Sequence, residues 1–293
     1  MRYVLMNGEC IPENEATIPL NERAFLFGDG VFTTILVEDG KICFLNEHLE
    51  RLKSDCAALR LSPPNIIPQQ LSTLIFSNHA LKGEWRLKVY VTGGRGDSLD
   101  LPEGRHGLVF ATLIPYARPK ESGYRLTSFP SSLTSPLSAY KTMAYLERLY
   151  LRQYARDRGY DDVLVFSPNG HLLDTAFSNV FWTDGTYLYV PHMEMNYQMG
   201  TTLTLLIKEA ERLEMTVIYG KWALNDLPEE ASLYRCNSLI GVQAITQVDD
   251  RMFGNNPTFE DSLVAVYHAR RKAHAFVAKK TAPSDENTCS GCG

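Results

Sequence analysis

The segment from Tyr140 to Trp182 constrains the fold most. A helix is expected from just after Lys141 to about Arg158, where Gly159 follows. Short β-rich runs come next, at Asp162–Phe166, His171–Asp174 and Asn179–Trp182, with the turn Ser167-Pro-Asn-Gly170 between the first two. One helix followed by closely spaced short strands predicts a strand-rich unit in this part of the chain.

Lys141 and Asp174 lie in this segment, before the predicted helix and at the end of a predicted short strand. An enzyme that uses pyridoxal phosphate needs an amine to form the Schiff base and a carboxylate to keep the pyridine nitrogen protonated. A single lysine at a helix start is more often a solvated surface residue. The spacing therefore raises the hypothesis of such a site, and other parts of the chain must support it.

The first 116 residues mix predicted strands and helices. Asn7-Gly8 and Glu38-Asp-Gly40 are hairpin turns, and Gly28-Asp-Gly30 is a tight turn before a strand. Amphipathic helices are expected over 47–59, with Asn46 as N-cap, and over 69–81. Strands are expected over 2–7, 31–37, 41–44, 85–92 and 107–114. Residues 1–116 are predicted to form a small α/β domain.

Residues 117–123 are expected to be a linker, because prolines and charged residues cluster around them. Strands dominate afterwards, and helices are expected over 203–213 and, as a long closing helix, over 259–278. Residues 124–280 are thus predicted to form a larger domain. The polar segment 281–293 is expected to be a flexible tail.

Composition excludes several classes of protein. The net charge of −5 gives no electrostatic case for binding nucleic acid, and no apolar run is long enough to span a membrane. Four of the six cysteines are scattered in apolar surroundings, as in a reduced, cytoplasmic protein. Cys289 and Cys292 form a single Cys-x-x-Cys pair, which could be a redox pair but is too little for a zinc site, so no metal site is predicted.

Several motifs in order along the chain resemble those of the fold-type IV pyridoxal phosphate enzymes. They are Phe27-Gly-Asp-Gly-Val-Phe-Thr-Thr34, His48-Leu-Glu-Arg-Leu52, Lys141 with its helix, Asp161–Phe166 with Asn179–Trp182, and Cys236-Asn-Ser-Leu239. Any one of these motifs alone is a weak signal. The resemblance spans roughly residues 2–275. It implies a two-domain α+β fold like that of D-amino acid aminotransferase, with a small α/β N-terminal domain and a larger strand-rich pseudo-barrel C-terminal domain.

The resemblance also implies roles for individual residues. Lys141 matches the lysine that binds pyridoxal 5'-phosphate covalently and moves protons, and Asp174 matches the acidic partner of the pyridine nitrogen. Arg51 suits a phosphate, because its guanidinium can donate two parallel hydrogen bonds. The rest of the phosphate site is expected from Thr201 and Thr202, at a helix N-terminus, and from Ser238 with the amide of Leu239.

The chain departs from the family pattern at three positions. Asp174 stands where glutamate is usual, Ala144 where asparagine often follows the lysine, and Leu203 where arginine often follows the phosphate loop. Aspartate is one methylene shorter than glutamate, so either the cofactor or the strand must shift by roughly 1 Å to keep the hydrogen bond.

The family contains branched-chain aminotransferases, D-amino acid aminotransferases and 4-amino-4-deoxychorismate lyases. Thr33-Thr34 is typical of the lyases, whereas the aminotransferases commonly carry a glutamate in this region. Gly93-Gly-Arg-Gly96, Asn237-Ser-Leu239 and Phe181-Trp182 are also lyase-like. The resemblance therefore favours the lyase, with a class IV aminotransferase for branched-chain or D-amino acids as the alternative.

Such a lyase acts on a carboxylated amine, so a cationic side chain is expected near the substrate. Arg95, in the flexible loop Gly93–Gly96, is the candidate, and Thr33, Thr34 and Tyr145 are expected to line the substrate pocket. The family is dimeric, with active sites near the subunit interface, so the resemblance also implies a homodimer.

Overall fold

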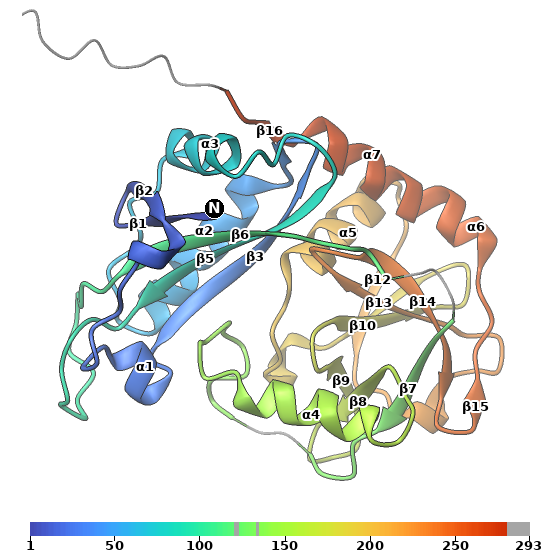
Figure 1. Cartoon of the computed structure of the whole chain (residues 1–293). Helices are drawn as coiled ribbons and strands as arrows, with labels where there is room; N and C mark the ends of the chain where they lie inside the picture. Colours follow the sequence, from blue (N-terminus) through green and yellow to red (C-terminus); the bar gives the residue numbers. More distant parts are fainter. Residues whose placement is uncertain (120–122, 133–134, 280–293) are drawn as a thin grey trace, which may run out of the picture.

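The computed structural model describes residues 1–119, 123–132 and 135–279, which form a two-domain α+β fold built on two sheets (Figure 1). The first sheet has seven strands in the order β16-β4-β3-β5-β6-β1-β2. Its strands are β1 (Tyr3–Met6), β2 (Glu9–Pro12), β3 (Gly30–Glu38), β4 (Lys41–Ile42), β5 (Glu84–Thr92), β6 (Val109–Pro115) and β16 (Phe276–Val277).

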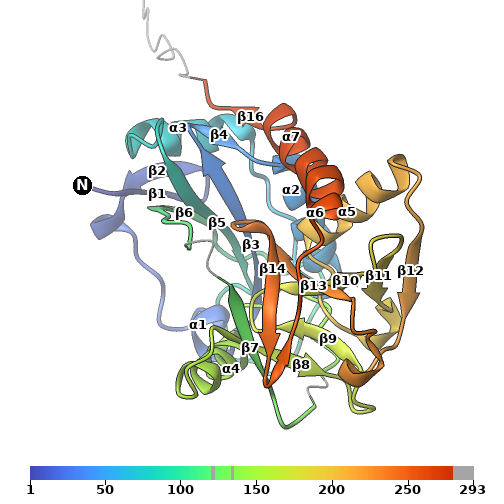
Figure 2. The same ribbon diagram turned by 90° about the vertical axis from the view of Figure 1, so that its right-hand side faces the viewer.

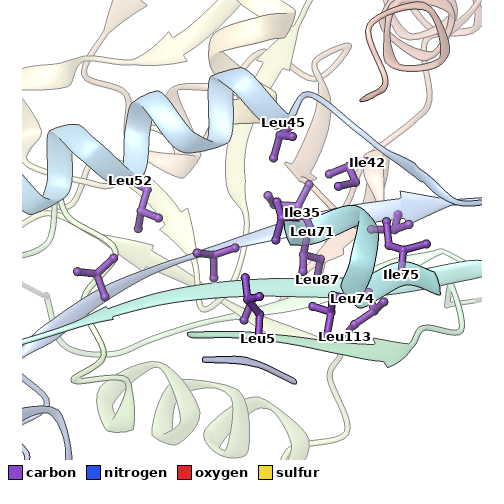
Figure 3. Close-up of a cluster of buried hydrophobic side chains, with 14 of the residues drawn as sticks. Leu5, Ile35, Ile42, Leu45, Leu52, Leu71, Leu74, Ile75, Leu87 and Leu113 are labelled. Atoms are coloured by element: carbon purple, nitrogen blue, oxygen red, sulfur yellow. The ribbon is translucent and has the colours of Figure 1, made fainter. Parts of the chain in front are cut away.

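Helices α2 (Leu45–Ala58) and α3 (Pro68–Ser77) cover one face of this sheet, and the short helix α1 (Arg23–Phe27) precedes β3. Alternate residues of β3, including Val31 and Ile35, are fully buried against leucine and isoleucine side chains of the two helices (Figure 3). Leu36, on the other face of β3, is buried against the C-terminal domain instead. The long strand β3 therefore contributes side chains to both domains.

The second sheet closes into a barrel. Strand β9 pairs with β8 on one side and with β10 on the other, which joins the ends of the path β10-β13-β14-β7-β8-β9. Its strands are β7 (Tyr124–Ser128), β8 (Asp162–Phe166), β9 (Leu172–Thr175), β10 (Asn179–Thr183), β11 (Leu188–Pro191), β12 (Val217–Gly220), β13 (Ser232–Asn237), β14 (Gly241–Val248) and β15 (Arg251–Met252). Closure of the barrel brings Asp174 of β9 opposite Asn179 of β10.

Helix α4 (Leu146–Arg156) packs on β8, and α5 (Thr201–Arg212) lies between the barrel and the closing helices (Figures 1 and 2). The closing segment comprises α6 (Pro257–Phe259), a π-helical turn over Glu260–Val264, and α7 (Ala265–Ala273). None of the described helices combines the length and the apolar character that a bilayer crossing requires.

Two local predictions are wrong. The single helix expected over 259–278 is interrupted by the π-helical turn and ends at Ala273, and Phe276–Val277 forms strand β16, which pairs with β4 at the edge of the first sheet. The helix expected from 47 begins at Leu45, so Asn46 lies inside it, and Phe44 occupies the N-cap in a left-handed conformation. The tail 281–293, with Cys289 and Cys292, lies outside the described residues.

Candidate active site

A cavity lies between the two domains, because residues of both line it. Small-molecule sites commonly occur at such domain interfaces. Residues from β3, α2, the segment before α4, the barrel strands and the start of α5 line it. They are Thr34, Arg51, Lys141, Tyr145, Arg148, Asp174, Thr175, Ala176, Phe177, Ser178, Asn179, Gln198, Gly200, Thr201, Thr202, Cys236, Asn237 and Ser238.

Backbone hydrogen bonds to the start of β3 hold Lys141 in place. The amide of Phe32 donates to the Lys141 carbonyl at 3.0 Å, and the amide of Met143 donates to the Gly30 carbonyl at 2.8 Å. The residues before α4 thus add a short extended piece beside β3. The N-terminal domain thereby positions the side chain of a residue that comes after that domain in the sequence.

The amine of Lys141 is held among aromatic rings. Its Nζ lies 4.9 Å from the ring centroid of Phe32 and donates to the Tyr145 hydroxyl at 3.3 Å. Burial, followed by the positive charges of Arg51, Arg148 and Lys88, lowers the pKa of Lys141 to about 7. A large fraction of the amine is therefore neutral at neutral pH, as a nucleophile or base must be.

Arg51 projects from α2 into the same cavity. Its Nη2 donates to Thr33 Oγ1 at 3.0 Å, and Asp55 lies 3.5 Å from its Nη1. Among the residues that the structure describes, none accepts a hydrogen bond from its buried Nε or Nη1. A buried guanidinium with two free donors is suited to bind an anion in the cavity.

The N-terminus of α5 faces Arg51 across the cavity. Gly200 is the N-cap residue, so the amides of Thr201 and Thr202 belong to the first turn, which has no intrahelical acceptors. Asn179 holds this start in place, because its Oδ1 accepts from the Gly200 amide at 2.8 Å. Together with Ser238 on the cavity wall, these groups form a second set of donors for an anion.

Asp174 is buried, and both its carboxylate oxygens accept from Nη1 of Arg148, at 3.1 Å and 3.0 Å. The same Nη1 donates to the Thr175 carbonyl at 3.0 Å, which fixes the guanidinium on β9. Burial raises the pKa of Asp174, while Arg148 acts against that rise. The carboxylate in turn raises the pKa of Arg148, so the arginine carries its charge.

The structure thus brings Lys141, Asp174, Arg51, Thr201, Thr202 and Ser238 to one cavity, together with Thr34 and Tyr145. Thr33 lies on the opposite face of β3 from Thr34, fully buried, with its Oγ1 2.9 Å from His48 Nδ1. The amide of Leu239 donates to Asn237 Oδ1 at 3.0 Å, and Leu239 is not part of the cavity wall.

Arg95, the residue expected to bind the substrate's carboxylate, is exposed in the loop after β5 and lies outside the cavity wall. Lys88 is another cation, near Lys141, although it too is not among the residues that line the cavity. Lys88 of β5 pairs directly with Thr34 of β3, and its Nζ lies 4.9 Å from the Phe32 ring centroid. The Lys141 amine lies at the same distance from that centroid, so the two amines are within about 10 Å of each other.

Sequence reasoning missed Arg148, Lys88, His48 and Asn179. Arg148 lies on an amphipathic helix, where an arginine is usually solvated. Lys88 is one of alternating polar residues on a strand, and only the register with β3 shows which face it occupies. His48 stood inside a motif already quoted, but its neutral, buried state, with a pKa lowered to about 3 chiefly by burial, depends on the tertiary structure.

These groups suit a phosphorylated aldehyde. The two free donors of Arg51 and the start of α5 can hold a phosphate, and the Lys141 amine, with its low pKa, can bind an aldehyde carbon. Asp174 and Arg148 supply polar contacts elsewhere on the cavity wall.

Comparison with known proteins supports this view of the site. The model of the amino-transferase class IV family matches residues 30–248. A candidate branched-chain-amino-acid aminotransferase of Methanocaldococcus jannaschii is 26% identical over 88% of this chain and 91% of its own length. The aminodeoxychorismate lyase of Bacillus subtilis is 22% identical over 86% of this chain and 88% of its own length.

Solved structures show the same fold. A branched-chain aminotransferase of the thermophilic archaeon Thermoproteus uzoniensis superimposes with a TM-score of 0.81 at 19% identity, over 91% of this chain and 93% of its own. A candidate 4-amino-4-deoxychorismate lyase of Legionella pneumophila gives 0.79 at 26% identity, over 88% and 97%. The cofactor of this family is pyridoxal 5'-phosphate, which matches the donors in the cavity. The chain belongs to the class IV aminotransferase family of pyridoxal phosphate enzymes.

Proposed function

We propose that this chain is a 4-amino-4-deoxychorismate lyase, which releases pyruvate from its substrate and forms 4-aminobenzoate. The observation that carries the proposal is Thr34 on the cavity wall, in the same cavity as Lys141. Branched-chain aminotransferases of the family commonly carry Phe-Glu-Gly where this chain has Phe32-Thr-Thr34, so their glutamate stands at the position of Thr33, whose hydroxyl here contacts His48 and Arg51. The neutral hydroxyl of Thr34 on the wall places no repelling charge near a ring that carries carboxylates.

In this proposal the cofactor phosphate binds Arg51, the amides of Thr201 and Thr202, and Ser238, with Asp174 near the pyridine nitrogen. Leu239 reaches the phosphate only if its amide leaves Asn237. Thr33 acts through Arg51, because it accepts from Nη2 and leaves the other two donors for the phosphate. When bound, the cofactor withdraws electrons from the carbon that carries the substrate's nitrogen.

Lys141 moves the protons. With the cofactor held by Arg51, Thr201, Thr202 and Ser238, a Lys141 amine that the substrate's amine has displaced would be free to remove the proton from the ring carbon bearing that nitrogen. The C–H electron pair enters the ring, the C–O bond to the enolpyruvyl group breaks, and protonation of that group gives pyruvate. Tyr145, 3.3 Å from Nζ, keeps the freed amine near its position.

Lys88 is well placed for the ring carboxylate. In 4-amino-4-deoxychorismate the amine and this carboxylate lie at opposite ends of a six-membered ring, whereas an α-amino acid has both groups on one carbon. Two amines within about 10 Å of each other, both near the Phe32 ring, are compatible with the first arrangement. Burial lowers the pKa of Lys88, and a bound carboxylate would oppose this by favouring the charged amine.

The alternative is a class IV aminotransferase that acts on branched-chain or D-amino acids. The similarity to the Methanocaldococcus protein favours it. Such an enzyme would return the proton from Lys141 to the cofactor and would need a keto acid as a second substrate.

We also propose a homodimer. Large apolar side chains are exposed on and near α1 and on α4, where Phe25 is 69% and Leu146 78% exposed. The two helices lie on the same side of the molecule (Figures 1 and 2), and Gly28, at the end of α1, lies directly against Ala144. An apolar patch of this kind beside the cavity marks a site of protein association. Its members are Leu20, Phe25, Leu26, Phe27, Leu146, Leu149 and Tyr150, here called the α1–α4 patch.

The proposal is tested by incubating the purified protein with 4-amino-4-deoxychorismate and no keto acid. Formation of 4-aminobenzoate and pyruvate in equal amounts is expected. D-Alanine and L-leucine, each with 2-oxoglutarate, are assayed in parallel. Turnover of either amino acid without formation of 4-aminobenzoate would replace the lyase with the aminotransferase.

A further inference from the structure

Asp174, the acid expected at the pyridine nitrogen, does not stand alone in this chain. Both its oxygens accept from one guanidinium nitrogen of Arg148, and the side chains of both residues line the cavity. They are nearly buried, at 16% exposure for Arg148 and 7% for Asp174. The Thr175 carbonyl holds the same nitrogen, so the pair is fixed from the β9 side.

We infer that Arg148 is a positioning residue that makes the protonated pyridine nitrogen of the bound cofactor easier to deprotonate. A carboxylate without a cationic partner favours the protonated ring with its full negative charge. Here the charge of Arg148, at hydrogen-bond distance, compensates much of that charge. The ring nitrogen therefore lies beside a nearly neutral pair, and its proton is lost at lower pH than beside aspartate alone.

A second arginine acts in the same direction. Arg51 adds positive charge on the cavity wall, and Asp55, 3.5 Å from its Nη1, offsets part of that charge. Other titratable groups close by include Tyr145, Tyr197, Cys236 and Asp162, and burial raises the pKa of each, which keeps them neutral more readily. Glu147, beside Arg148, and Lys88, near Lys141, are further charged residues of opposite sign. The local field thus disfavours one further proton on the cofactor ring.

A cofactor ring without this proton withdraws electrons less strongly. The advantage of such a ring for this enzyme rests on the proposed lyase function. Loss of the enolpyruvyl group makes the substrate ring aromatic, so the lyase reaction needs little help in holding negative charge. Transamination has no such driving force and needs a strongly electron-withdrawing ring. A compensated aspartate would therefore favour elimination over transamination.

The test uses the enzyme loaded with pyridoxal phosphate labelled with ¹⁵N at the pyridine nitrogen and no substrate. The ¹⁵N chemical shift is followed across the pH range in which the protein stays folded. In the native protein the nitrogen is expected to lose its proton within that range. In Arg148→Gln the midpoint should rise by about one to two pH units, as expected from removing a charge roughly 5 Å away in a medium of intermediate dielectric constant.

Two further variants separate this role from a structural one. Arg148→Lys keeps the charge and should restore the midpoint most of the way. Arg156→Gln removes an arginine from the same helix whose partner is Asp161 at 3.9 Å, and it should leave the midpoint unchanged.

Equal midpoints in the native protein and Arg148→Gln would overturn the inference, as would a native nitrogen that stays protonated across the whole range. If Arg148→Gln does not hold the cofactor, Arg148→Met serves as the variant without the charge: a midpoint above that of the native protein supports the inference, and an equal or lower midpoint overturns it. No substrate is involved, so failure here is distinct from failure of the lyase assay.

Discussion

At the residue scale, the backbone of Lys141 is fixed by hydrogen bonds, and its side-chain amine is an unusually weak base for a lysine. Its carbonyl is bound to the start of β3, and its amine lies near Phe32, Tyr145 and three cationic residues. Because burial and these charges destabilise the ammonium form, they favour the neutral amine. The same groups therefore place the nucleophile and activate it.

The rate at which the protein without cofactor binds pyridoxal phosphate covalently should reflect this pKa. Because the neutral amine attacks and its pKa is lowered to about 7, the rate should rise with pH and level off just above 7, far below the ordinary value for lysine. The visible absorption of the bound cofactor, followed by stopped flow, measures the rate. In Lys141→Ala no covalent product and no turnover should appear; activity in that variant would mean that another residue is the catalytic amine.

Arg51→Gln should weaken cofactor binding by roughly 10- to 100-fold, because charge-assisted hydrogen bonds to a phosphate contribute about 1.5–3 kcal/mol. The dissociation constant is measured by titrating the protein with pyridoxal phosphate. Lys53→Gln, on the same helix and paired only with the exposed Glu50, should bind as the native protein does. An unchanged constant in Arg51→Gln would place the phosphate elsewhere.

At the scale of elements, β3 organises the site through simple alternation. Thr33 faces the helices and holds Arg51, Thr34 faces the cavity, and the Phe32 ring lies near both lysine amines. Its neighbour β5 supplies Lys88 directly opposite Thr34. The register between two strands therefore determines which polar residues reach the substrate.

Lys88→Met should raise KM for 4-amino-4-deoxychorismate about tenfold or more, because it removes the cation proposed to bind the ring carboxylate. Cofactor affinity should stay within about twofold. Arg95→Ala is the matched comparison, since it removes the other candidate cation. Steady-state kinetics of both variants distinguish the two residues. A large rise in KM in Arg95→Ala with none in Lys88→Met would show that Arg95, and not Lys88, binds the carboxylate.

Much of this arrangement could be predicted from the sequence. Short β-rich runs between turn signals indicated most of the strands, and motifs far apart in the chain indicated Lys141, Arg51, Thr201 and Ser238, which lie in one cavity. Contacts that no local pattern encodes could not be predicted. The five-residue helix α1 is too short to show a period, and β16 forms because the edge of a sheet built by distant residues offers it a partner.

At the scale of the whole molecule, the two domains share one site. The N-terminal domain supplies Arg51 and Thr34, the barrel supplies Asp174 and Ser238, and the start of α5 adds Thr201 and Thr202. The Lys141 segment joins the two, because it precedes α4 but bonds to β3. Relative movement of the domains would therefore separate Arg51 from the other hydrogen-bond donors proposed to bind the phosphate. The interface between the two domains is thus part of the site.

The α1–α4 patch lies beside this shared site, and its burial between two copies should make the protein a dimer. Phe25→Asp with Leu149→Asp places two charges in the proposed interface and should give a monomer, because desolvating unpaired carboxylates is costly. Light scattering after size-exclusion chromatography measures the mass. Leu99→Asp changes a residue that is 85% exposed in the loop between β5 and β6, and it should remain dimeric.

The double variant should also lose activity if the partner copy closes the cavity mouth, while its circular dichroism spectrum stays native because both side chains are on the surface of the single chain. A native protein that is monomeric at micromolar concentration would exclude the patch as a dimer interface. A double variant that remains dimeric would show that the dimer interface lies on another face of the molecule. Loss of activity together with dissociation would show that the site, already divided between two domains, also depends on the second chain.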